Sequence, residues 1–362
     1  MYIITSTPFY NLDFLYMKTY KYRIYPTKIQ QEYLWKCFWC CRFVYNRWLW
    51  LSKEKYQWYY NLANQLKQLK KDNVWLKDTY SQSLQYSLKC LDTSFQNFFK
   101  KKWKYPRFKK KCNINSIHYP QFTSITDREI KIPKIWYIKC KFHRPCLWKI
   151  KSMTITKTAS WKYYVSILTD YSEWKPNWVW EVWIDMWIKE FAILSNWMVY
   201  HNPKYLKKSQ KRLKRLQRQM GRKKKRSSNR NKFRIKLVKL YEKIRNQRLD
   251  FHHKVSREIA NQFWFVAMEN LNIKWMMKNH KLANSIWDVG RHQFKTLLMY
   301  KTKVVEIDTF QPSSKACSNC WNIKETLTLQ DRTYHCNVCW YVEDRDVNAA
   351  KNILAMAQSS KF

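Results

Sequence analysis

Four cysteines in the last quarter of the chain constrain its fold more than any other feature. They form two CxxC pairs, CSNC and CNVC, with fifteen residues between the pairs: Cys317, Cys320, Cys336 and Cys339. Two pairs at this spacing, in a chain without a secretory signal, are typical of a tetrahedral zinc site with four thiolate ligands rather than of disulfides. Such a closed site leaves no coordination position open for chemistry. The sequence therefore predicts a structural zinc ion, and any reaction must depend on carboxylates elsewhere.

The charge of the chain indicates the partner. Lys and Arg number 70 against 25 Asp and Glu, so the formal net charge is +45 over 362 residues. Any one basic run also fits a solvated face, but an excess of this size destabilises a compact chain through self-repulsion unless a counter-charge relieves it. We therefore expect a polyanionic partner, with nucleic acid as the leading candidate.

The chain is also unusual in having 2 glycines and 21 tryptophans. Average glycine usage of about 7% would give roughly 25 glycines in a chain of this length. Trp321 and Trp340 each follow the second cysteine of a CxxC pair, where a tight turn favours glycine. Trp197 follows an asparagine between two apolar runs, where Asn-Gly would form a hairpin turn. We hypothesise that the source organism reads UGA as glycine and that many of these tryptophans stand for glycine, Gly221 and Gly290 being encoded by ordinary codons.

A chain that is truly rich in tryptophan is the alternative, and Trp75 in VWLKD is a candidate for a genuine tryptophan. Under the recoding hypothesis the stretch KKWKYPRFKKK is a basic loop and not a surface for stacking bases. The codons at Trp187, Trp197, Trp321 and Trp340 decide between the two interpretations, because UGG there would exclude recoding.

Targeting signals are missing from the sequence. Residues 1–16 have neither a basic start nor a continuous apolar core, so they do not resemble a signal peptide. Met17 is the expected start of translation, which makes 1–16 a non-native or disordered extension. No run of 18 uncharged apolar residues predicts a membrane span. The cysteines outside the two pairs are expected to be buried thiols of a cytoplasmic protein, and the lone CxxC at Cys37 and Cys40 has no second pair nearby.

Periodicity divides the rest of the chain into three sections. Helical spacing over 27–103 predicts a helical lobe, inserted between an opening strand at 17–26 and short alternating strands within 104–178. These strands predict a β-barrel or a small sheet. The third section starts with two β runs joined by a turn at Asn196. It continues with a basic helical hairpin at 203–262, a buried strand at 263–272, a helix over about 282–300, a strand at 302–308 and, after the cysteines, a helix from about 346 to 356.

Three acidic residues stand out by their positions in this third section. Asp185 interrupts an apolar strand, Glu269 lies near the end of another, and Asp346 begins the final helix. A carboxylate buried in an apolar strand is costly unless it is paired or binds a metal. The three could converge at the edge of a sheet and hold two Mg²⁺ ions for phosphodiester hydrolysis. The alternative is that Asp185 lies in a turn, Glu269 forms a salt bridge and Asp346 caps a helix.

Several motifs make the chain similar to a known family. They are YKYRIYPTKIQQ, CCRFVYNRWL, WIDMWIKEFAILSNW, VAMENLNIKWMMKNHKLANSIWDVG, the CSNC and CNVCW pairs, and DRDVNAAKNIL. With these motifs, residues 17–356 resemble the OrfB/TnpB family of insertion-sequence proteins, which are relatives of the type V CRISPR effector nucleases. Several tryptophans fall where the family pattern has glycine, which supports the recoding hypothesis independently.

The resemblance implies an architecture. The expected fold class is α/β with added all-α and β-barrel parts. A β-barrel is expected at 17–26 and 104–178 and a helical recognition lobe at 27–103. An RNase H-like RuvC nuclease domain is expected at 179–316 and 340–356, with a zinc ribbon at 317–339 and a tail at 357–362.

The resemblance also implies an activity. By motif, the catalytic triad of the family corresponds to Asp185, Glu269 and Asp346, with Asp344 as the close competitor for the third position. These residues would bind Mg²⁺, and a guide RNA from the transposon end would direct cleavage of a DNA target. We therefore expect a transposon-encoded, RNA-guided DNA endonuclease. The alternative is a nucleic-acid-binding transposon accessory or regulator without catalysis, and a transposase that itself joins DNA strands is a weaker third interpretation.

Overall fold

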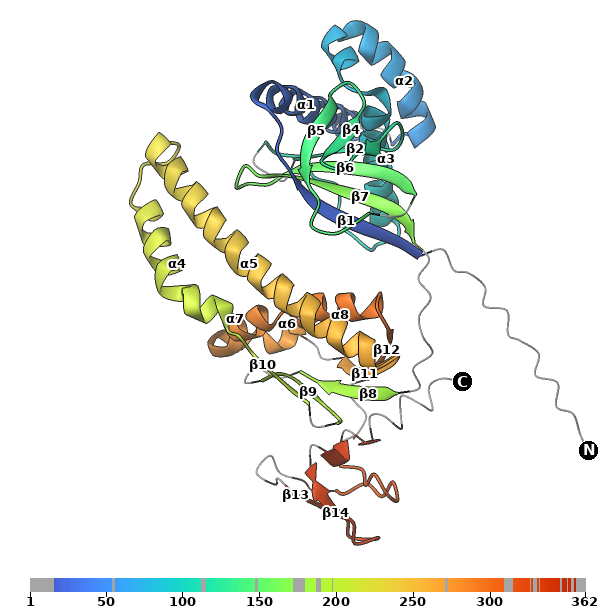
Figure 1. Ribbon diagram of the computed structural model, residues 1–362, viewed down its shortest axis with the longest axis vertical. Coiled ribbons are helices and arrows are strands. Elements are labelled where there is room, and N and C mark those ends of the chain that lie inside the picture. The colour runs from blue at the N-terminus through green and yellow to red at the C-terminus, as the bar shows by residue number, and fades with distance from the viewer. Residues whose placement is uncertain are drawn as a thin grey trace, which may run out of the picture. The chain divides into compact units, whose positions relative to one another are not determined.

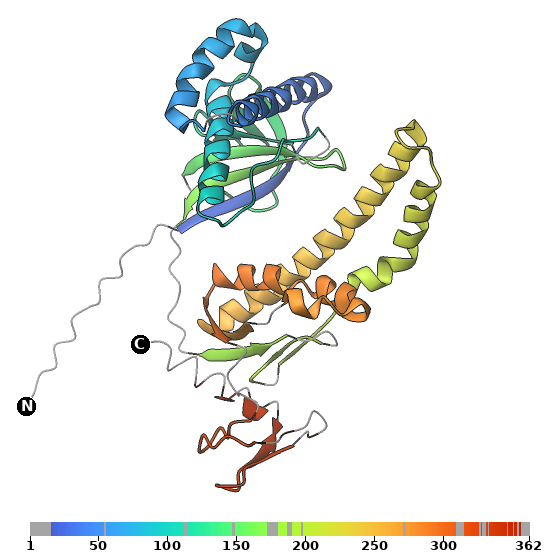
Figure 2. The same cartoon turned by 180° about the vertical axis from the view of Figure 1, so that it is seen from behind.

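We describe the protein from a computed structural model (Figures 1 and 2). The structure describes residues 16–53, 56–111, 115–146, 149–171, 180–186, 190–196, 198–270, 273–308, 315–325, 327, 331, 333–345, 347–349, 351–352 and 355. The chain divides into two units, Met1–Trp174 and Lys175–Phe362, and each is treated by itself. Most of the predicted extension over 1–16 lies outside the described residues.

A seven-stranded antiparallel sheet forms the centre of the first unit. Its strands follow the order β2-β6-β7-β1-β5-β4-β3. Their bounds are β1 (Tyr16–Ile24), β2 (Asn115–Tyr119), β3 (Ser124–Ile125), β4 (Glu129–Ile132), β5 (Trp136–Lys141), β6 (Ile150–Lys157) and β7 (Tyr163–Tyr171). The opening strand β1 pairs with β7 along its whole length and with β5 at its end, which confirms that it belongs to this sheet.

The sheet of the first unit is open rather than a closed barrel. Within the described residues its end strands β2 and β3 do not pair with each other. The strand β3 is only two residues long, and α1 (Lys28–Leu51) and α3 (Ser81–Phe99) contact β2 at the other end. The predicted barrel is therefore corrected to a half-barrel sheet, because one end strand is too short to close it and the other is covered by helices.

The helices of the first unit share their core with the sheet. Besides α1 and α3 they include α2 (Tyr59–Asp72) and the short 3-10 helix η1 (Val74–Asp78). The first helix begins with a capping box, in which Thr27 Oγ1 accepts from the Gln30 N–H and Gln30 Oε1 accepts from the Thr27 N–H. The helical spacing of apolar residues here predicts one buried face, and five of its six residues are buried while Tyr33 is half-buried: Leu34, Phe38, Cys41, Val44 and Leu49.

A five-stranded mixed sheet forms the second unit's centre. Its order is β10-β9-β8-β11-β12, with bounds β8 (Glu181–Asp185), β9 (Glu190–Leu194), β10 (Val199–His201), β11 (Phe265–Asn270) and β12 (Lys303–Asp308). The strands β8, β11 and β12 run parallel, whereas β8, β9 and β10 run antiparallel. The two β runs predicted at the start of this section are three strands, because the chain reverses after Asp185 as well as at Asn196.

The helices of the second unit are α4 (Tyr205–Gly221), α5 (Ser228–Gln262), α6 (Ile273–Met276), α7 (His280–Val289) and α8 (Arg291–Met299). Figure 1 shows α4 and α5 as the predicted hairpin, and they share a small core with Leu213, Leu237 and Ile244. The second helix of the hairpin starts at Ser228, because Ser227 Oγ accepts from the Arg230 N–H and caps it. The helix predicted at 282–300 is two helices, because Gly290 takes a left-handed conformation between them.

Side-chain alternation gives the second sheet two different faces. One face packs Ile184 and Met268 against apolar residues of α5, α7 and α8, including Ile259 and Phe294. The other face carries Trp183, Phe265, Ala267 and Ile307. Because successive side chains of a strand point to opposite faces, Asp185 and Glu269 belong to this second face.

The cysteine segment contains a two-stranded antiparallel sheet of β13 (Thr333–His335) and β14 (Val342–Asp344). Residues 345, 347–349, 351–352 and 355 are helical, which places the final helix about where the sequence predicts it. Among the described residues, no helix is long and apolar enough to cross a membrane.

The backbone geometry supports the recoding hypothesis. Nine described non-glycine residues have positive φ, and four of them are tryptophans: Trp136, Trp161, Trp321 and Trp340, with φ from 58° to 69°. The Trp161 N–H donates to the Thr158 carbonyl in the tight turn between β6 and β7, a position that commonly takes glycine in such hairpins. Trp161 is 61% exposed and Trp340 is 82% exposed, although tryptophan is usually largely buried. These four positions have the geometry that glycine adopts without strain.

We predict that replacing Trp321 and Trp340 together with glycine stabilises the protein. Removing two bulky residues from the left-handed region relieves about 1 kcal/mol at each position. Denaturant unfolding of zinc-loaded protein measures the change. As a control, Trp35→Gly within α1 should destabilise by about 1 kcal/mol, since glycine weakens a helix interior. Equal losses in both variants would show that the φ values carry no strain.

Candidate active site and metal centre

The four predicted cysteines come together in the structure. One sulfur from each of Cys317, Cys320, Cys336 and Cys339 lies within 4.8 Å of the others. The Sγ atoms of Cys317 and Cys339 are 3.6 Å apart, as are those of Cys320 and Cys336. Sulfurs around a tetrahedral Zn²⁺ with bonds of about 2.3 Å are separated by about 3.8 Å. The cluster therefore has the size and the donor atoms of a zinc site.

Local backbone groups favour the thiolate form in one half of this cluster. The backbone N–H of Tyr341 lowers the pKa of Cys339 to about 6, and backbone N–H groups of Cys339 and Val338 lower the pKa of Cys336. A thiolate is the form that binds metal. In contrast, burial raises the pKa of Cys37 to about 11, and no other group that could hold a metal is found among the described residues. The lone CxxC at Cys37 and Cys40 is thus part of the apolar core.

Strand register brings two of the three predicted carboxylates together. The parallel strands β8 and β11 pair Ile184 with Met268, so Asp185 and Glu269 are the next residues along on each strand. Both are half-buried and share one face at the carboxyl ends of the strands. Two carboxylates side by side offer the oxygen ligands that Mg²⁺ prefers. The pair therefore fits a divalent cation.

An arginine that the sequence analysis did not single out lies near this pair. Arg291 is the first residue of α8 and interacts electrostatically with Asp185 and with Glu269. Burial raises the pKa of Glu269, and the positive charge of Arg291 opposes that change. Sequence could have indicated this residue only through its place after Gly290, which has a left-handed φ of +63° between α7 and α8.

The third predicted carboxylate, Asp346, lies outside the described residues. Its competitor Asp344 ends β14, and its Oδ1 accepts from the Val347 N–H at 3.2 Å. This bond caps the start of the final helix, which is the role that the alternative interpretation gave to Asp346.

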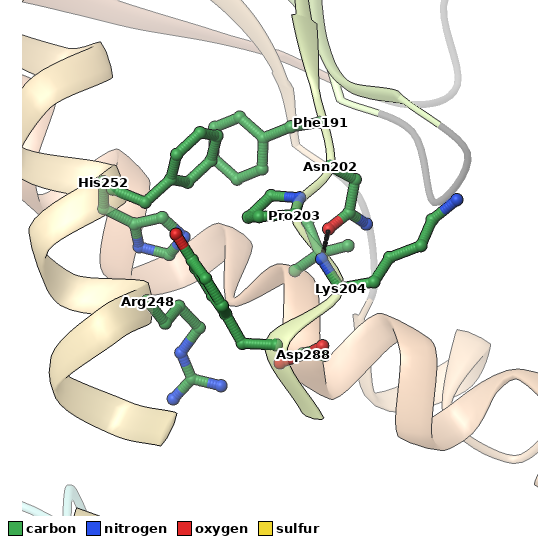
Figure 3. Close-up of a pocket in the computed structure, with 10 residues that line it drawn as sticks. Phe191, Asn202, Pro203, Lys204, Arg248, His252 and Asp288 are labelled. Carbon is green, nitrogen blue, oxygen red and sulfur yellow. Dashed lines mark hydrogen bonds between the residues drawn. The ribbon is translucent and has the colours of Figure 1, made fainter. Parts of the chain in front are cut away.

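A small pocket of the second unit lies beside α5 and α7 (Figure 3). Three buried polar atoms of its lining have no hydrogen-bond partner among the residues that the structure describes, namely Arg248 Nε, His252 Nδ1 and Asp288 Oδ1. The cavity measures about 10 Å³, which is room for about one water molecule with such polar partners. It is too small for a substrate, so it belongs to the structure of the α5 and α7 junction rather than to chemistry.

Comparison with known proteins agrees with this geometry. The family model OrfB_IS605, described as a probable transposase, matches residues 167–280, which include Asp185 and Glu269. A Cas12f1-like TNB domain model matches residues 292–353, which include the four cysteines. A protein of Streptomyces pristinaespiralis, named as an RNA-guided DNA endonuclease, is 33% identical over 93% of this chain and 89% of its own length. The chain belongs to the OrfB family of insertion-sequence proteins.

Other OrfB relatives and a solved structure extend the match. InsQ of Escherichia coli (strain K12), also named as an RNA-guided DNA endonuclease, is 30% identical over 94% of this chain and 92% of its own length. A cryo-EM structure of the Cas12f1-sgRNA-target DNA complex contains a similar chain, with a TM-score of 0.54 and 14% identity over 90% of this chain and 83% of that one. This likeness shows a shared fold.

A third family model, described as a helix-turn-helix domain, matches residues 17–59 of this OrfB protein. In the structure most of that segment is the strand β1 followed by the long helix α1. The matched region therefore joins a sheet strand to the helical core of the first unit, and its described part is not a pair of helices around a turn.

We predict that Cys336→Ser removes bound zinc and destabilises the second unit. Cys336 is buried, and losing one of four ligands leaves an incomplete tetrahedral site. Zinc content of the purified protein and its thermal unfolding measure the effect. Cys140→Ser, a buried cysteine of the first unit, is the matched control and should keep the zinc. Full zinc content in Cys336→Ser would contradict the site.

We also predict a pH dependence that originates at His252. Burial lowers the pKa of His252 to about 4 in the folded protein, below its value near 6.5 in an unfolded chain. Above pH 6.5 His252 does not affect stability, and as the pH falls only the unfolded state gains the proton. The free energy of unfolding should therefore drop by about 2 kcal/mol between pH 7 and pH 5.

Denaturant unfolding of wild type and His252→Phe at the two pH values isolates this contribution from other titrating groups. The variant should lose about 2 kcal/mol less than wild type. His292→Gln changes an exposed histidine of α8 and serves as the control, with the same pH dependence as wild type. An identical pH dependence in all three proteins would show that His252 titrates normally.

Proposed function

We propose that this OrfB protein is an RNA-guided DNA endonuclease that hydrolyses phosphodiester bonds with two Mg²⁺ ions in an RuvC-like, RNase H-like domain. The parallel pairing of β8 and β11 up to Ile184 and Met268, which puts Asp185 and Glu269 next along at the carboxyl ends of two neighbouring inner strands, is the observation that carries the proposal. The names of the two relatives that match over most of their length support the same activity. The mixed strand order β10-β9-β8-β11-β12, with helices on one face, suits an RNase H-like sheet.

The residues of the proposed active site have defined tasks. Asp185 and Glu269, with Asp346 or Asp344 as the third carboxylate, would hold the metal ions. The bound Mg²⁺ ions would activate a water molecule and stabilise the leaving oxygen of the phosphodiester. Arg291 balances the negative charge of the first two carboxylates, and burial of Glu269 on an apolar sheet limits its contact with water. The four cysteines would hold a structural zinc ion that takes no part in the reaction.

The proposed partners are a DNA target and a guide RNA from the transposon end, in the cytoplasm. If base pairing reads the target, the protein needs mainly contacts to phosphates, which a large positive charge supplies. In the α4 and α5 hairpin, exposed basic residues follow each other closely, for example Lys211, Arg212, Lys214, Arg215 and Arg218. The hairpin is therefore our candidate for a surface along the nucleic-acid backbone.

A binding protein without catalysis is the second candidate. It is favoured only if the tryptophans are genuine, because Trp183 then fills the sheet face beside Asp185. The Trp183 indole N–H is buried and has no hydrogen-bond partner among the described residues, which is unfavourable for a native tryptophan. Glycine at this position would open the face that carries both carboxylates.

We predict that Asp185→Asn abolishes cleavage of a guide-matched DNA duplex. The substitution keeps the shape of the side chain and removes the charge that a metal ion requires, so the rate should fall by at least about 1000-fold. Cleavage by the protein assembled with guide RNA, in Mg²⁺, measures it. Asp250→Asn, which changes an exposed carboxylate of α5, should cleave at the wild-type rate. Wild-type cleavage by Asp185→Asn would remove this residue from the site.

The same assay distinguishes the two candidates for the third carboxylate. If Asp346 completes the site, Asp346→Asn should be as inactive as Asp185→Asn, whereas Asp344→Asn should cleave at close to the wild-type rate, because asparagine caps a helix about as well as aspartate does. The reverse pattern would assign the third position to Asp344.

A further inference from the structure

Two asparagines connect the final helix to the first cysteine pair. Asn348 and Asn352 are fully buried, with no exposed surface. Their side-chain amides both donate to the Ala316 carbonyl, each at 2.7 Å. Asn348 Oδ1 also accepts from the Ser318 N–H at 2.8 Å. The backbone on both sides of Cys317 is thus held by side chains of the final helix.

The same helix continues directly from the acidic segment. Asp344 and Asp346 come four and two residues before Asn348 in the sequence. Asp344 Oδ1 caps the helix through the Val347 N–H, and Lys351 Nζ donates to Glu343 Oε1 at 2.7 Å. The acidic segment is therefore joined through a short helix to the backbone that carries the first cysteine ligand.

Buried hydrogen bonds of this kind couple the positions of the two groups that they join. Ala316 and Ser318 flank Cys317, whose sulfur is part of the four-cysteine cluster. A metal held by the four cysteines would fix these backbone groups, and the two asparagines would extend that constraint to the helix. Because both asparagine side chains are fully buried, water could not easily replace their hydrogen bonds if these were broken.

We infer that Asn348 and Asn352 are positioning residues that couple the four-cysteine cluster to the acidic segment 343–346, so that zinc in the cluster sets the place of the third active-site carboxylate. The inference rests on the proposed function in assuming that this segment contributes a carboxylate. Neither asparagine touches the reacting atoms in this scheme, and each acts through the backbone. Binding of zinc and ordering of the segment are then reciprocal, since each stabilises the other.

Hydrogen exchange tests this coupling without any cleavage. In wild type, removal of zinc with a chelator should raise amide exchange in residues 342–349 by at least ten-fold, because the helix loses its anchor. In Asn348→Ala the exchange should already be fast with zinc bound and should change less than two-fold on chelation. The variant should also bind zinc roughly ten-fold more weakly in a competition titration with a chromophoric chelator.

Two further variants make the test specific. Asn352→Leu keeps the volume of the side chain and removes one of the two bonds to Ala316, so it should give an intermediate response even if Asn348→Ala fails to fold. Lys324→Met removes a different contact of the cysteine segment, to the His335 carbonyl, leaves the asparagine bonds intact and should keep the zinc-dependent exchange of wild type. The inference would be overturned if amide exchange in wild type did not change on zinc removal, or if the asparagine variants showed the same change as wild type.

Cleavage kinetics separate this inference from the proposed function. If both hold, the asparagine variants should lower kcat at least ten-fold with little change in KM, because metal placement fails while nucleic-acid binding remains. A protein that shows the zinc-dependent exchange and never cleaves DNA would contradict the nuclease function and leave the coupling intact. Normal kcat in Asn348→Ala with uncoupled exchange would show that the acidic segment supplies no carboxylate, and would overturn the inference.

Discussion

Parallel pairing between β8 and β11 is the constraint on which the candidate site depends. The register places Ile184 opposite Met268, and the next residues on both strands are acidic. A shift of one residue would turn every side chain of the strand to the other face and bury the carboxylates under α8. The apolar contacts of Ile184 and Met268 with the helices oppose such a shift. Packing on one face of the sheet thus fixes where the two carboxylates lie on the other face.

Much of this arrangement could be predicted from the sequence. The cysteine spacing predicted a cluster because two CxxC pairs at this separation are typical of a metal site with four thiolate ligands. The spacing of apolar residues in α1 predicted which face of the helix is buried. The half-barrel, the separation of β8 from β9 and the division at Gly290 could not be predicted, because they depend on partners and turns that periodicity does not report. Arg291 was missed for a similar reason, since a charge in the first turn of a helix has the sequence signal of a solvated residue.

The tryptophans show how composition and geometry inform each other. Composition alone indicated too few glycines, and it could not say which tryptophans would stand for glycine under the recoding hypothesis. The positive φ values at Trp136 and Trp161 add two turns to the two cysteine knuckles named from the sequence. Trp48, in contrast, is buried in α1 and its indole N–H donates to Gln65 Oε1, which is how a native tryptophan is accommodated. Local conformation therefore distinguishes the two populations residue by residue.

The position of Arg291 has a consequence for how the protein matures. Two neighbouring carboxylates normally repel each other and resist burial until a cation arrives. Here the chain supplies a positive charge from its own helix, so the strands can pair without a cation from solution. If the carboxylates bind metal ions as proposed, ion binding can follow folding and is not required to drive it.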